Sequence, residues 1–376
     1  MVSVLALVPK PFGISPGQRF RLEQWAPLLR SRHGISIDFS PFESPALTEV
    51  LYQHGRRATK AALMLQDAFR RREALATAAG YDAVVIYREV SLLGPAVYER
   101  LLARGRIPII FDFDDAIWIA GAGTVNGAFS RLRFPGKTAT ICRLASAVVV
   151  GNQYLAEYAR RHSQHVHVVP TTVDLNLFPL QPHLPYEDPF TIVWSGSLST
   201  LPQLETARSA LERLGRRRRT VLRVICSRPP PWEIDGVTTE FVPWSAEGEA
   251  ATLGRAHAGI MPLPDNQFTR GKCGAKALLC MAVGVPVVIS PVGVNAEIIE
   301  SGRNGLLART ADEWVAALDS LASSPALRER LGLAGRITVQ ERYSADIGAA
   351  KFAQVVTSVL AERASSTNEE GATGGC

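Results

Sequence analysis

Short apolar runs alternate with longer helical stretches along most of this chain, and this alternation limits its possible folds more than any other feature. The runs expected to form strands lie at residues 2–8, 35–39, 83–87, 107–111, 147–150 and 166–169, and then at 190–194, 221–226, 239–242, 259–263 and 286–290. Strands that are apolar on both faces and separated by helices are typical of parallel sheets covered on both sides. The pattern therefore predicts an α/β fold.

The alternation is interrupted once, by a proline-rich segment at residues 178–189 with little periodicity. Such a segment is typical of a linker, and 376 residues suffice for two domains of ordinary size. We therefore expect two doubly wound, Rossmann-like domains at 1–176 and 185–344. A helix is expected at 345–363, and the Ser-, Gly- and Glu-rich residues 364–376 are expected to form a disordered tail.

The composition is that of an ordinary globular protein, with 47% hydrophobic and 20% charged residues. No apolar stretch approaches the roughly 20 residues of a membrane-spanning helix. The apolar start of the chain lacks a basic leader and a cleavage site, so we expect a buried strand there and not a signal peptide. The five cysteines include no CxxC pair, which favours a reducing, cytoplasmic setting over disulfides or a zinc site.

Basic residues concentrate at residues 56–72 of a chain whose net charge is +6. Leucine, methionine and phenylalanine are interspersed among them. The stretch is a candidate basic amphipathic helix on a membrane surface, which would make the protein peripheral at the inner face of a membrane. The alternative is a solvated helix that packs its apolar side on its own domain. We expect no nucleic-acid partner.

Ligands of open parallel sheets bind beyond the carboxyl ends of the strands, so the loops that follow strands are the candidate sites. The loop after the fourth strand of the second half contains Arg270, Lys272, Cys273, Gly274 and Lys276. A helix that begins near Cys273 or Gly274 would direct free N–H groups at an anion. Lys272 and Lys276, four residues apart, would share one face of that helix. These features predict a diphosphate site; the alternative is two exposed lysines on a solvated turn.

Two further loops of the second half are weaker candidates. After its first strand, Gly196 would let a ligand approach the backbone closely, and Ser197 and Thr200 offer hydroxyl groups. An ordinary strand-to-helix turn with a Ser or Thr cap explains the same residues. Trp244, which follows the strand at 239–242, is a candidate to stack on a nucleobase, with packing inside the domain as the alternative.

In the first half, the loop after the first strand contains Gly13 and Gly17 and leads into Arg19 and Arg21. It does not match the GxGxxG fingerprint, which disfavours a simple NAD enzyme. Cations near a helix start are locally unfavourable, and a negatively charged ligand would relieve this. The alternative is that both arginines are ordinary surface residues.

Three carboxylates, Asp112, Asp114 and Asp115, follow the strand at 107–111. Because three carboxylates at one strand end are costly to bury together, we expect them to face solvent, a cation or a substrate. Sugar hydroxyls are good partners for carboxylates. A metal site is the lesser alternative, since two carboxylates are few ligands for a divalent ion, and we expect no essential metal or other cofactor.

Several segments together resemble a known family. The chain is similar over nearly its whole length to GT-B glycosyltransferases related to family 4, a large retaining group. The run MAVGVPVVISPVGVNAEII is similar to the family's usual EAMACGTPVVAS…GG..E. The similarity rests on this run and on residues 168–174 (VVPTTVD), 274–284 and 301–307 (SGRNGLL).

The resemblance implies two domains that face a central cleft, with a nucleotide sugar in the second half and an acceptor in the first. It also implies that the final helix crosses back to the first domain. The acceptor half would include Gly13, Gly17, Arg19 and Arg21. In the family, a pair of backbone N–H groups meets the donor diphosphate, and this pair corresponds to Cys273 and Gly274. The family's Gly-rich turn and the glutamate after it correspond to Gly293 and Glu297. The family's acceptor-side His-Asp pair corresponds to Asp114 and Asp115.

Two parts of the family's donor site differ in this sequence. The family's paired glutamates fall on Gly271 and Leu279, and the second normally holds the nucleotide ribose. The family's Gly-Arg…Lys phosphate clamp falls on Gly196, Ser197 and Pro202, so both of its cations are missing. The resemblance therefore implies a divergent branch.

Lys272 and Lys276, with Arg270 nearby, would return the missing positive charge from the facing loop. The predicted activity is that of a hexosyltransferase, which moves a sugar from a nucleoside-diphosphate sugar to a hydroxyl acceptor with retention, in glycan or glycoconjugate biosynthesis. The two lysines would stabilise the leaving diphosphate, and Asp114 and Asp115 would orient acceptor hydroxyls. Inversion would instead make one aspartate the general base.

Three other functions fit parts of the pattern. A nucleotide-sugar epimerase of the same fold would need no acceptor. A catalytically inactive partner subunit that binds nucleotide sugar fits the missing glutamates. A two-lobed solute-binding protein is disfavoured because no export signal is recognised. The residues do not identify the acceptor, but the basic stretch at 56–72 favours a lipid-linked or membrane-surface glycan.

Overall fold

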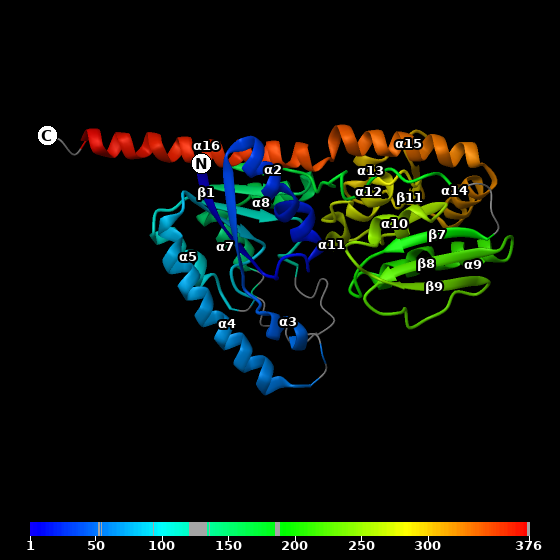
Figure 1. Cartoon of the computed structure of the whole chain (residues 1–376), viewed down its shortest axis with the longest axis horizontal. Coiled ribbons are helices and arrows are strands. Elements are labelled where there is room, and N and C mark those ends of the chain that lie inside the picture. The colour runs from blue at the N-terminus through cyan, green and yellow to red at the C-terminus, as the bar shows by residue number, and fades with distance from the viewer. Residues whose placement is uncertain are drawn as a thin grey trace. The chain divides into compact units, whose positions relative to one another are not determined.

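The computed structural model describes residues 1–51, 53, 55–92, 94–119, 134, 136–184 and 189–373, and for residues 366–373 it describes the backbone alone. Within this part the chain forms two compact units (Figure 1). The second unit comprises Thr171–Ile347, and the first comprises the described residues on either side of it. Each unit is built on its own six-stranded parallel sheet with helices around it, as the alternating pattern predicts.

The first sheet has the strand order β2-β1-β3-β4-β5-β6, which places a topological switch point between β1 and β3. Doubly wound sheets bind ligands beyond the carboxyl ends of the strands at such a point. The strands are β1 (Val2–Val8), β2 (Ile35–Pro41), β3 (Ala83–Tyr87), β4 (Ile109–Phe113), β5 (Ala147–Val150) and β6 (Val166–Val168). The helices are α1 (Pro16–Gln18), a π-helical turn (Arg19–Glu23), α2 (Gln24–His33), α3 (Pro45–Leu51), α4 (Arg57–Thr77), α5 (Val97–Arg104), α7 (Gly136–Leu144) and α8 (Gln153–Arg160).

The final helix, α16 (Ala345–Thr373), returns from the second unit to the first. Phe352 packs against Trp25 of α2 with a ring-centroid separation of 5.6 Å, and Arg363 donates a hydrogen bond to the carbonyl oxygen of Asp82. The helix continues to Thr373, through most of the segment expected to be a disordered tail. Extending a helix costs less than starting one, and Ala364, Glu369 and Glu370 are good helix formers.

The second sheet has the order β12-β11-β10-β7-β8-β9, so its switch point lies between β7 and β10. Its strands are β7 (Phe190–Ser195), β8 (Thr220–Cys226), β9 (Val237–Pro243), β10 (Ala258–Met261), β11 (Val287–Ile289) and β12 (Leu306–Leu307). Its helices are a 3-10 turn (Leu201–Ala207), α9 (Arg208–Gly215), α10 (Glu249–Gly254), α11 (Gln267–Arg270), α12 (Ala275–Ala282), α13 (Asn295–Ile298), α14 (Ala311–Ser323) and α15 (Pro325–Arg342).

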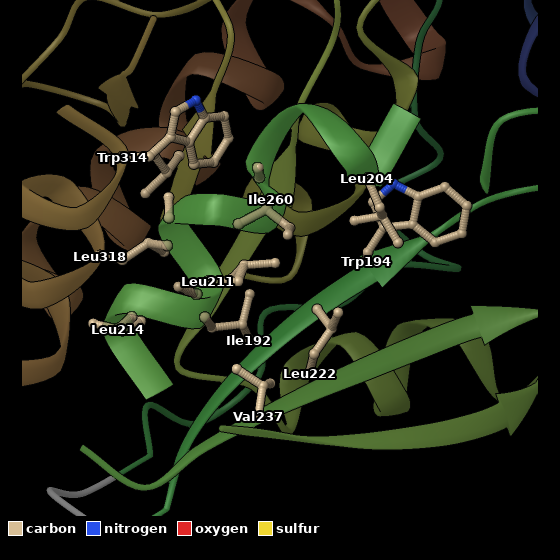
Figure 2. Packing of buried hydrophobic residues seen from close by; sticks show 14 of the residues in the cluster. Ile192, Trp194, Leu204, Leu211, Leu214, Leu222, Val237, Ile260, Trp314 and Leu318 are labelled. Atoms are coloured by element: carbon tan, nitrogen blue, oxygen red, sulfur yellow. The ribbon is translucent and has the colours of Figure 1, made fainter. Parts of the chain in front are cut away.

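The core of the second unit lies between its sheet and the helices α9 and α14 (Figure 2). Ile192 and Leu222 project from β7 and β8 toward Leu211 of α9, and Leu318 of α14 lies beside that helix. Trp194, at the carboxyl end of β7, belongs to the same cluster and is almost fully buried. The buried strand therefore holds the start of the following loop in a fixed place.

Most strands lie where the sequence predicts them, but β4 lies two residues later than expected. The prediction ended this strand at residue 111, whereas β4 includes Asp112 and Phe113. Tyr87 pairs with Asp112 in the register of β3 and β4, so Arg88 and Asp114 follow the ends of neighbouring strands. The strand β12 was not predicted, because two residues give no detectable alternation. Small differences also occur at the ends of β2, β9 and β10.

None of the helices in the described ranges combines the length and the apolar character needed to cross a membrane.

Candidate functional site

The loop after β7 and the first turn of α12 meet at the switch point of the second sheet. Lys276 donates a hydrogen bond from Nζ to Oγ1 of Thr200 over 3.2 Å, and the same ammonium lies 5.0 Å from the centroid of the Trp194 ring, within the range of a cation–π interaction. A Cβ atom on Gly196 would lie 2.6 Å from the Trp194 ring and 2.8 Å from Lys276 Nζ. A larger residue at this position would therefore displace the lysine.

The hydroxyl of Thr200 is held in place by its own loop. It accepts a hydrogen bond from the Ser197 N–H over 3.2 Å and donates one to the Ser197 carbonyl over 3.0 Å. Thr200 is buried, while Ser197 is exposed. The structure thus brings together Gly196, Ser197, Thr200 and Lys276, which the sequence placed in two separate candidate loops.

The helix α12 begins where the sequence predicts. Its N-terminal cap is Gly274, whose φ of +72° lies in the left-handed region that favours glycine. A Cβ atom there would lie 2.3 Å from Cδ1 of Ile298, so no other residue fits without a shift. The N–H groups of the first turn of a helix have no partner within the helix and attract anions. Cys273, just before the cap, is buried with its Sγ 3.7 Å from the Gly271 carbonyl.

The prediction that Lys272 and Lys276 share one helix face is wrong. The helix α11 ends at Arg270 and α12 begins at Ala275, so Lys272 lies between two helices. Its ammonium lies 4.5 Å from the centroid of the Phe268 ring. Arg270 forms an ion pair with a neighbouring carboxylate over 2.6 Å. Lys276, on α12 itself, contacts Thr200 of the loop after β7.

The loop after β11 packs on the same helix start. Gly293 has a φ of +56°, and a Cβ atom there would lie 2.4 Å from the carbonyl oxygen of Arg270. Asn295 is fully buried and donates from Nδ2 to a backbone carbonyl over 2.9 Å. Its Oδ1 has no hydrogen-bond partner among the described residues and lies 3.6 Å from the Cβ position of Gly274. Glu297, in contrast, is exposed.

Trp244 lies farther from this loop than the other candidates along the sheet. It follows β9, an edge strand that β8 separates from β7. Its side chain is half-buried, and its backbone N–H donates to the carbonyl of Cys226. Stacking of Trp244 on a nucleobase stays a prediction.

A second cluster of candidate residues lies at the switch point of the first sheet. Arg88 donates from Nε and Nη2 to Oδ1 of Asp114 over 2.8 and 2.6 Å, and from Nη2 to Oδ2 of Asp115 over 2.7 Å. The Tyr87 hydroxyl donates to the same Asp114 oxygen over 2.7 Å. A Cβ atom on Gly17 would lie 2.2 Å from the Tyr87 oxygen and 2.5 Å from Oδ2 of Asp114. The loop after β1 therefore closes over these groups only because residue 17 is glycine.

The electrostatics of this cluster favour an ionised Asp114. Burial raises the pKa of Asp114, but the charges of Arg88 and Arg21 and the hydrogen bonds from Tyr87 and Arg88 outweigh burial and leave that pKa below its ordinary value. Burial lowers the pKa of Arg88, and the Asp114 charge reverses this, so Arg88 stays protonated. Arg88 also has a φ of +61°, which is uncommon for a residue other than glycine and is frequent at functional sites.

Tyr87 and Arg88 are absent from the sequence-based candidates. Tyr87 is the last residue of the strand at 83–87 and Arg88 follows it, so the rule that ligands bind after strand ends applies to them as well. No motif in the sequence marks these two residues, and their interaction with Asp114 becomes visible only when β3 and β4 pair.

The expectation that Asp112 faces solvent or a ligand is wrong, because Asp112 lies inside β4. It forms an ion pair with Arg21, with Nε–Oδ1 and Nη2–Oδ2 distances of 2.7 and 2.9 Å, and both side chains are fully buried. Arg21 also donates from Nη1 to the Val169 carbonyl over 2.7 Å. Burial raises the pKa of Asp112 even though Arg21 opposes the shift. Arg21 therefore joins strands within the fold, and the prediction that it contacts an acceptor does not fit its burial.

The remaining acceptor-side candidates organise the loop after β1. The Gly13 N–H donates to Oε2 of Glu23 over 2.9 Å, and Gln18 donates to Oε1 of Glu23 over 2.6 Å. Gly13 has a φ of +82°, which suits glycine. Burial raises the pKa of Glu23. Arg19 is half-buried, with its guanidinium 4.8 Å from the centroid of the Phe20 ring.

Comparison with known proteins assigns the fold. A family model described as glycosyl transferases group 1 matches residues 189–324. The structure is similar to sucrose-phosphate synthase from Thermosynechococcus elongatus, with a TM-score of 0.69, 16% identity, and coverage of 96% of this chain and 100% of that one. It is also similar to Anabaena HepE in complex with UDP and glucose (TM-score 0.63, 14% identity, coverage 95% and 100%) and to the lipopolysaccharide outer core galactosyltransferase WaaB (TM-score 0.63, 12% identity, coverage 95% and 99%).

These likenesses show the GT-B fold. The family match lies within the second unit. A search of curated protein sequences gave no match.

Proposed function

We propose that this chain is a divergent relative of family 4 glycosyltransferases that transfers a hexose from a nucleoside-diphosphate sugar to a hydroxyl acceptor. The observation that carries the proposal is the contact of Lys276 with Thr200 and Trp194 beside Gly196. This contact puts a cation where two strand-end loops meet the start of α12. A diphosphate bound there would meet both the ammonium and backbone N–H groups.

The chemical role proposed for Lys276 is to stabilise the leaving group. As the bond between the sugar C1 and the diphosphate oxygen breaks, negative charge grows on the diphosphate. Preorganised cations and N–H groups aimed at that charge are usually the largest catalytic contribution of an enzyme. Lys272, on the neighbouring loop, is the second cation in this proposal. The complexes of HepE with UDP and sugar support a nucleotide sugar as the donor.

We further propose that the configuration at the sugar carbon is retained. A general base needs a pKa near the working pH, whereas the pKa of Asp114 is below its ordinary value and its Oδ1 is occupied by Tyr87 and Arg88. In the proposed reaction the acceptor oxygen bonds to C1, and its proton passes to the departing diphosphate oxygen. Asp114 and Asp115 orient acceptor hydroxyls and take up no proton.

The acceptor in this proposal is a lipid-linked or membrane-surface glycan, in glycan or polysaccharide biosynthesis at the cytoplasmic face of a membrane. The exposed arginines of α4 support this choice. We also propose that no metal ion is essential, because Lys276 and the α12 N–H groups supply the positive charge that a divalent ion would otherwise provide.

A thermal-shift panel tests the donor site. UDP, GDP, dTDP and ADP and their common sugar conjugates are added to the protein with and without EDTA. A ligand that binds only the folded state stabilises it by about 2.7 kcal/mol at a hundred times its Kd, so one nucleotide is expected to raise the Tm, equally with EDTA. The Lys276→Ala variant should lose most of that shift, and the exposed-site control Lys351→Ala should keep it. No shift with any nucleotide would refute the proposed donor site.

One observation favours a second candidate, a partner subunit that binds nucleotide sugar without turnover. The position that normally holds the ribose is Leu279, which is apolar and buried. Turnover separates the two candidates. Free nucleotide released from the donor in the presence of acceptor glycolipids identifies an enzyme, and a nucleotide-dependent Tm shift with no release identifies the binding subunit.

A further inference from the structure

The helix α4 buries charged side chains and exposes apolar ones. Lys60, Asp67 and Arg71 are 6%, 1% and 2% exposed, whereas Leu65 and Phe69 are 64% and 63% exposed. Leu65 and Phe69 are four residues apart, so they lie on one face of the helix. Large apolar side chains that are exposed together on a folded surface mark a place where something else binds.

Polar contacts on the inner side fix this orientation of α4. Arg71 donates to the carbonyl oxygens of Val8 and Ser40 over 3.0 and 2.9 Å, at the ends of β1 and β2. Asp67 accepts hydrogen bonds from the backbone N–H and the hydroxyl of Ser44 over 2.8 and 2.9 Å. Rotating the helix to bury Leu65 and Phe69 would break these bonds and leave buried polar groups unsatisfied. The exposed face is therefore a stable feature.

The alternative in which α4 packs its apolar side on its own domain is only partly right. Leu63 and Met64 are half-buried against the small core of Phe42, Leu47 and Leu92, so part of the apolar side does pack on the unit itself. Leu65 and Phe69 remain exposed. The helix α4 itself lies at the edge of the first unit (Figure 1).

The helix α5 extends the exposed surface. The Tyr98 hydroxyl donates to the Ala68 carbonyl over 3.1 Å, which joins the two helices. On α5, Val97 and Leu101 are 50% and 48% exposed. We call the surface formed by Leu65, Phe69, Val97 and Leu101 the α4–α5 face.

The charges around the α4–α5 face are mostly positive. Arg57 and Arg72 on α4, and Arg100 and Arg104 on α5, are exposed. No ion pair involves these four arginines within the part of the chain that the structure describes. One exposed carboxylate, Glu73, lies on the same helix as Arg72. Apolar side chains bordered by arginines match a surface with an apolar interior and anionic headgroups.

We propose that the α4–α5 face docks on an anionic lipid bilayer. Leu65, Phe69, Val97 and Leu101 insert among the acyl chains, and the bordering arginines meet lipid phosphates. A second copy of the chain is a poorer occupant, because a two-fold symmetric contact would bring the same arginines of both copies together. Docking of this face rests on the membrane contact proposed above, but vesicle binding requires neither nucleotide nor turnover.

Cosedimentation with vesicles tests the proposal. Vesicles of phosphatidylcholine alone are compared with vesicles of equal parts phosphatidylcholine and phosphatidylglycerol. We expect binding to the anionic vesicles that weakens as salt rises. The double variant Leu65→Ser/Phe69→Ser should bind at least tenfold more weakly, because each side chain loses its burial in lipid. The double variant Arg57→Gln/Arg72→Gln should bind the anionic vesicles roughly 25-fold more weakly, since each basic residue near an anionic surface raises the affinity about fivefold.

Matched controls lie on the second unit. Ile337 of α15 is 53% exposed, and the side chain of Arg303 is 76% exposed, so Ile337→Ser and Arg303→Gln should bind vesicles like the wild type. The Tm of every variant is compared with the wild type to show that it is folded. Equal binding by wild type and Leu65→Ser/Phe69→Ser would overturn the proposal. Absence of vesicle binding would also overturn it, and concentration-dependent dimers that the same variant abolishes would then identify a second copy as the occupant.

Discussion

The switch points of the two sheets contain different kinds of contact. In the first unit, Asp112 and Asp114 are paired with Arg21 and Arg88 over 2.6 to 2.9 Å. In the second unit, Lys276 donates a hydrogen bond to the hydroxyl of Thr200 and lies beside the Trp194 ring. Both arrangements follow strand ends of doubly wound parallel sheets.

This difference separates charged side chains that stabilise the fold from charged side chains that are suited to bind a ligand. Buried ion pairs recover their desolvation cost only through each other, so removing one partner leaves an uncompensated charge. A lysine ammonium that meets a bound phosphate forms charge-assisted hydrogen bonds, which are stronger than neutral ones. The fully buried Arg21–Asp112 pair therefore belongs to the structure of the first unit, and Lys276 is the better candidate for direct contact with a substrate.

The largest expected effect comes from breaking the buried pair in the first unit. Arg21→Ala leaves Asp112 buried without its counter-ion, which should lower the free energy of unfolding by about 3–5 kcal/mol. Urea denaturation measures the loss. Arg30→Ala changes an exposed arginine of α2 and should cost less than about 0.5 kcal/mol. Similar stabilities of the two variants would contradict the view that Arg21 serves the fold.

The Lys276→Ala variant should show the reverse behaviour, with stability almost unchanged and turnover strongly reduced. The loss of one preorganised group that stabilises the developing charge typically lowers kcat by about 100- to 1000-fold. Kinetics with the donor found by the thermal-shift panel would measure this loss. Lys276→Arg keeps the charge and should recover part of the activity. Near-normal turnover of Lys276→Ala would remove this lysine from the mechanism.

A smaller effect is expected from crowding Lys276 without removing it. Gly196→Ala places a Cβ atom 2.8 Å from Nζ and 2.6 Å from the Trp194 ring, so the ammonium must shift. Misplacement of a catalytic group by about 1 Å costs up to about 100-fold in rate. Gly80→Ala is the matched control, because nothing lies within 4 Å of its added atom. If both variants have wild-type kcat, the fit at Gly196 is irrelevant to activity.

Much of the fold was predictable because apolar strands such as Ala83–Tyr87 are unbroken and β-branched. The start of α12 was also predictable, since Gly274 precedes an apolar helical run. The end of β4 was not, because Asp112 looks like a loop residue until Arg21, far away in the sequence, neutralises it. Long-range pairing of this kind has no local signal.

The candidate site shows the same limit. The sequence identified Gly196, Thr200 and Lys276 separately, and only the sheet order brings them together. Lys272 was predicted to share a helix face with Lys276 because the two residues are four apart. Gly274 lies between them, and its left-handed backbone places the start of α12 after Lys272. Arg88 gave no signal, because a left-handed arginine looks like any other arginine in a sequence.

The smallest expected effect is a change with pH in the stability that Asp114 contributes to the first unit. The pKa of Asp114 in the folded protein is below its ordinary value, so its contribution to stability is present above the unfolded pKa of about 3.9 and is lost as pH falls through the folded pKa. Asp114→Asn lacks this contribution. Its unfolding free energy should therefore be lower than that of the wild type at neutral pH, and the gap should narrow as pH falls below about 4.

Urea denaturation at a series of pH values follows this gap, and Asp312→Asn is the control because the side chain of Asp312 is 83% exposed. The control should differ little from the wild type at any pH, since exposed ion pairs contribute less than about 1 kcal/mol. A gap for Asp114→Asn that stays constant into acid would mean that its carboxylate is not held ionised by Arg88. Asp114 would then be a reasonable general base, and the case for retention would lose its support.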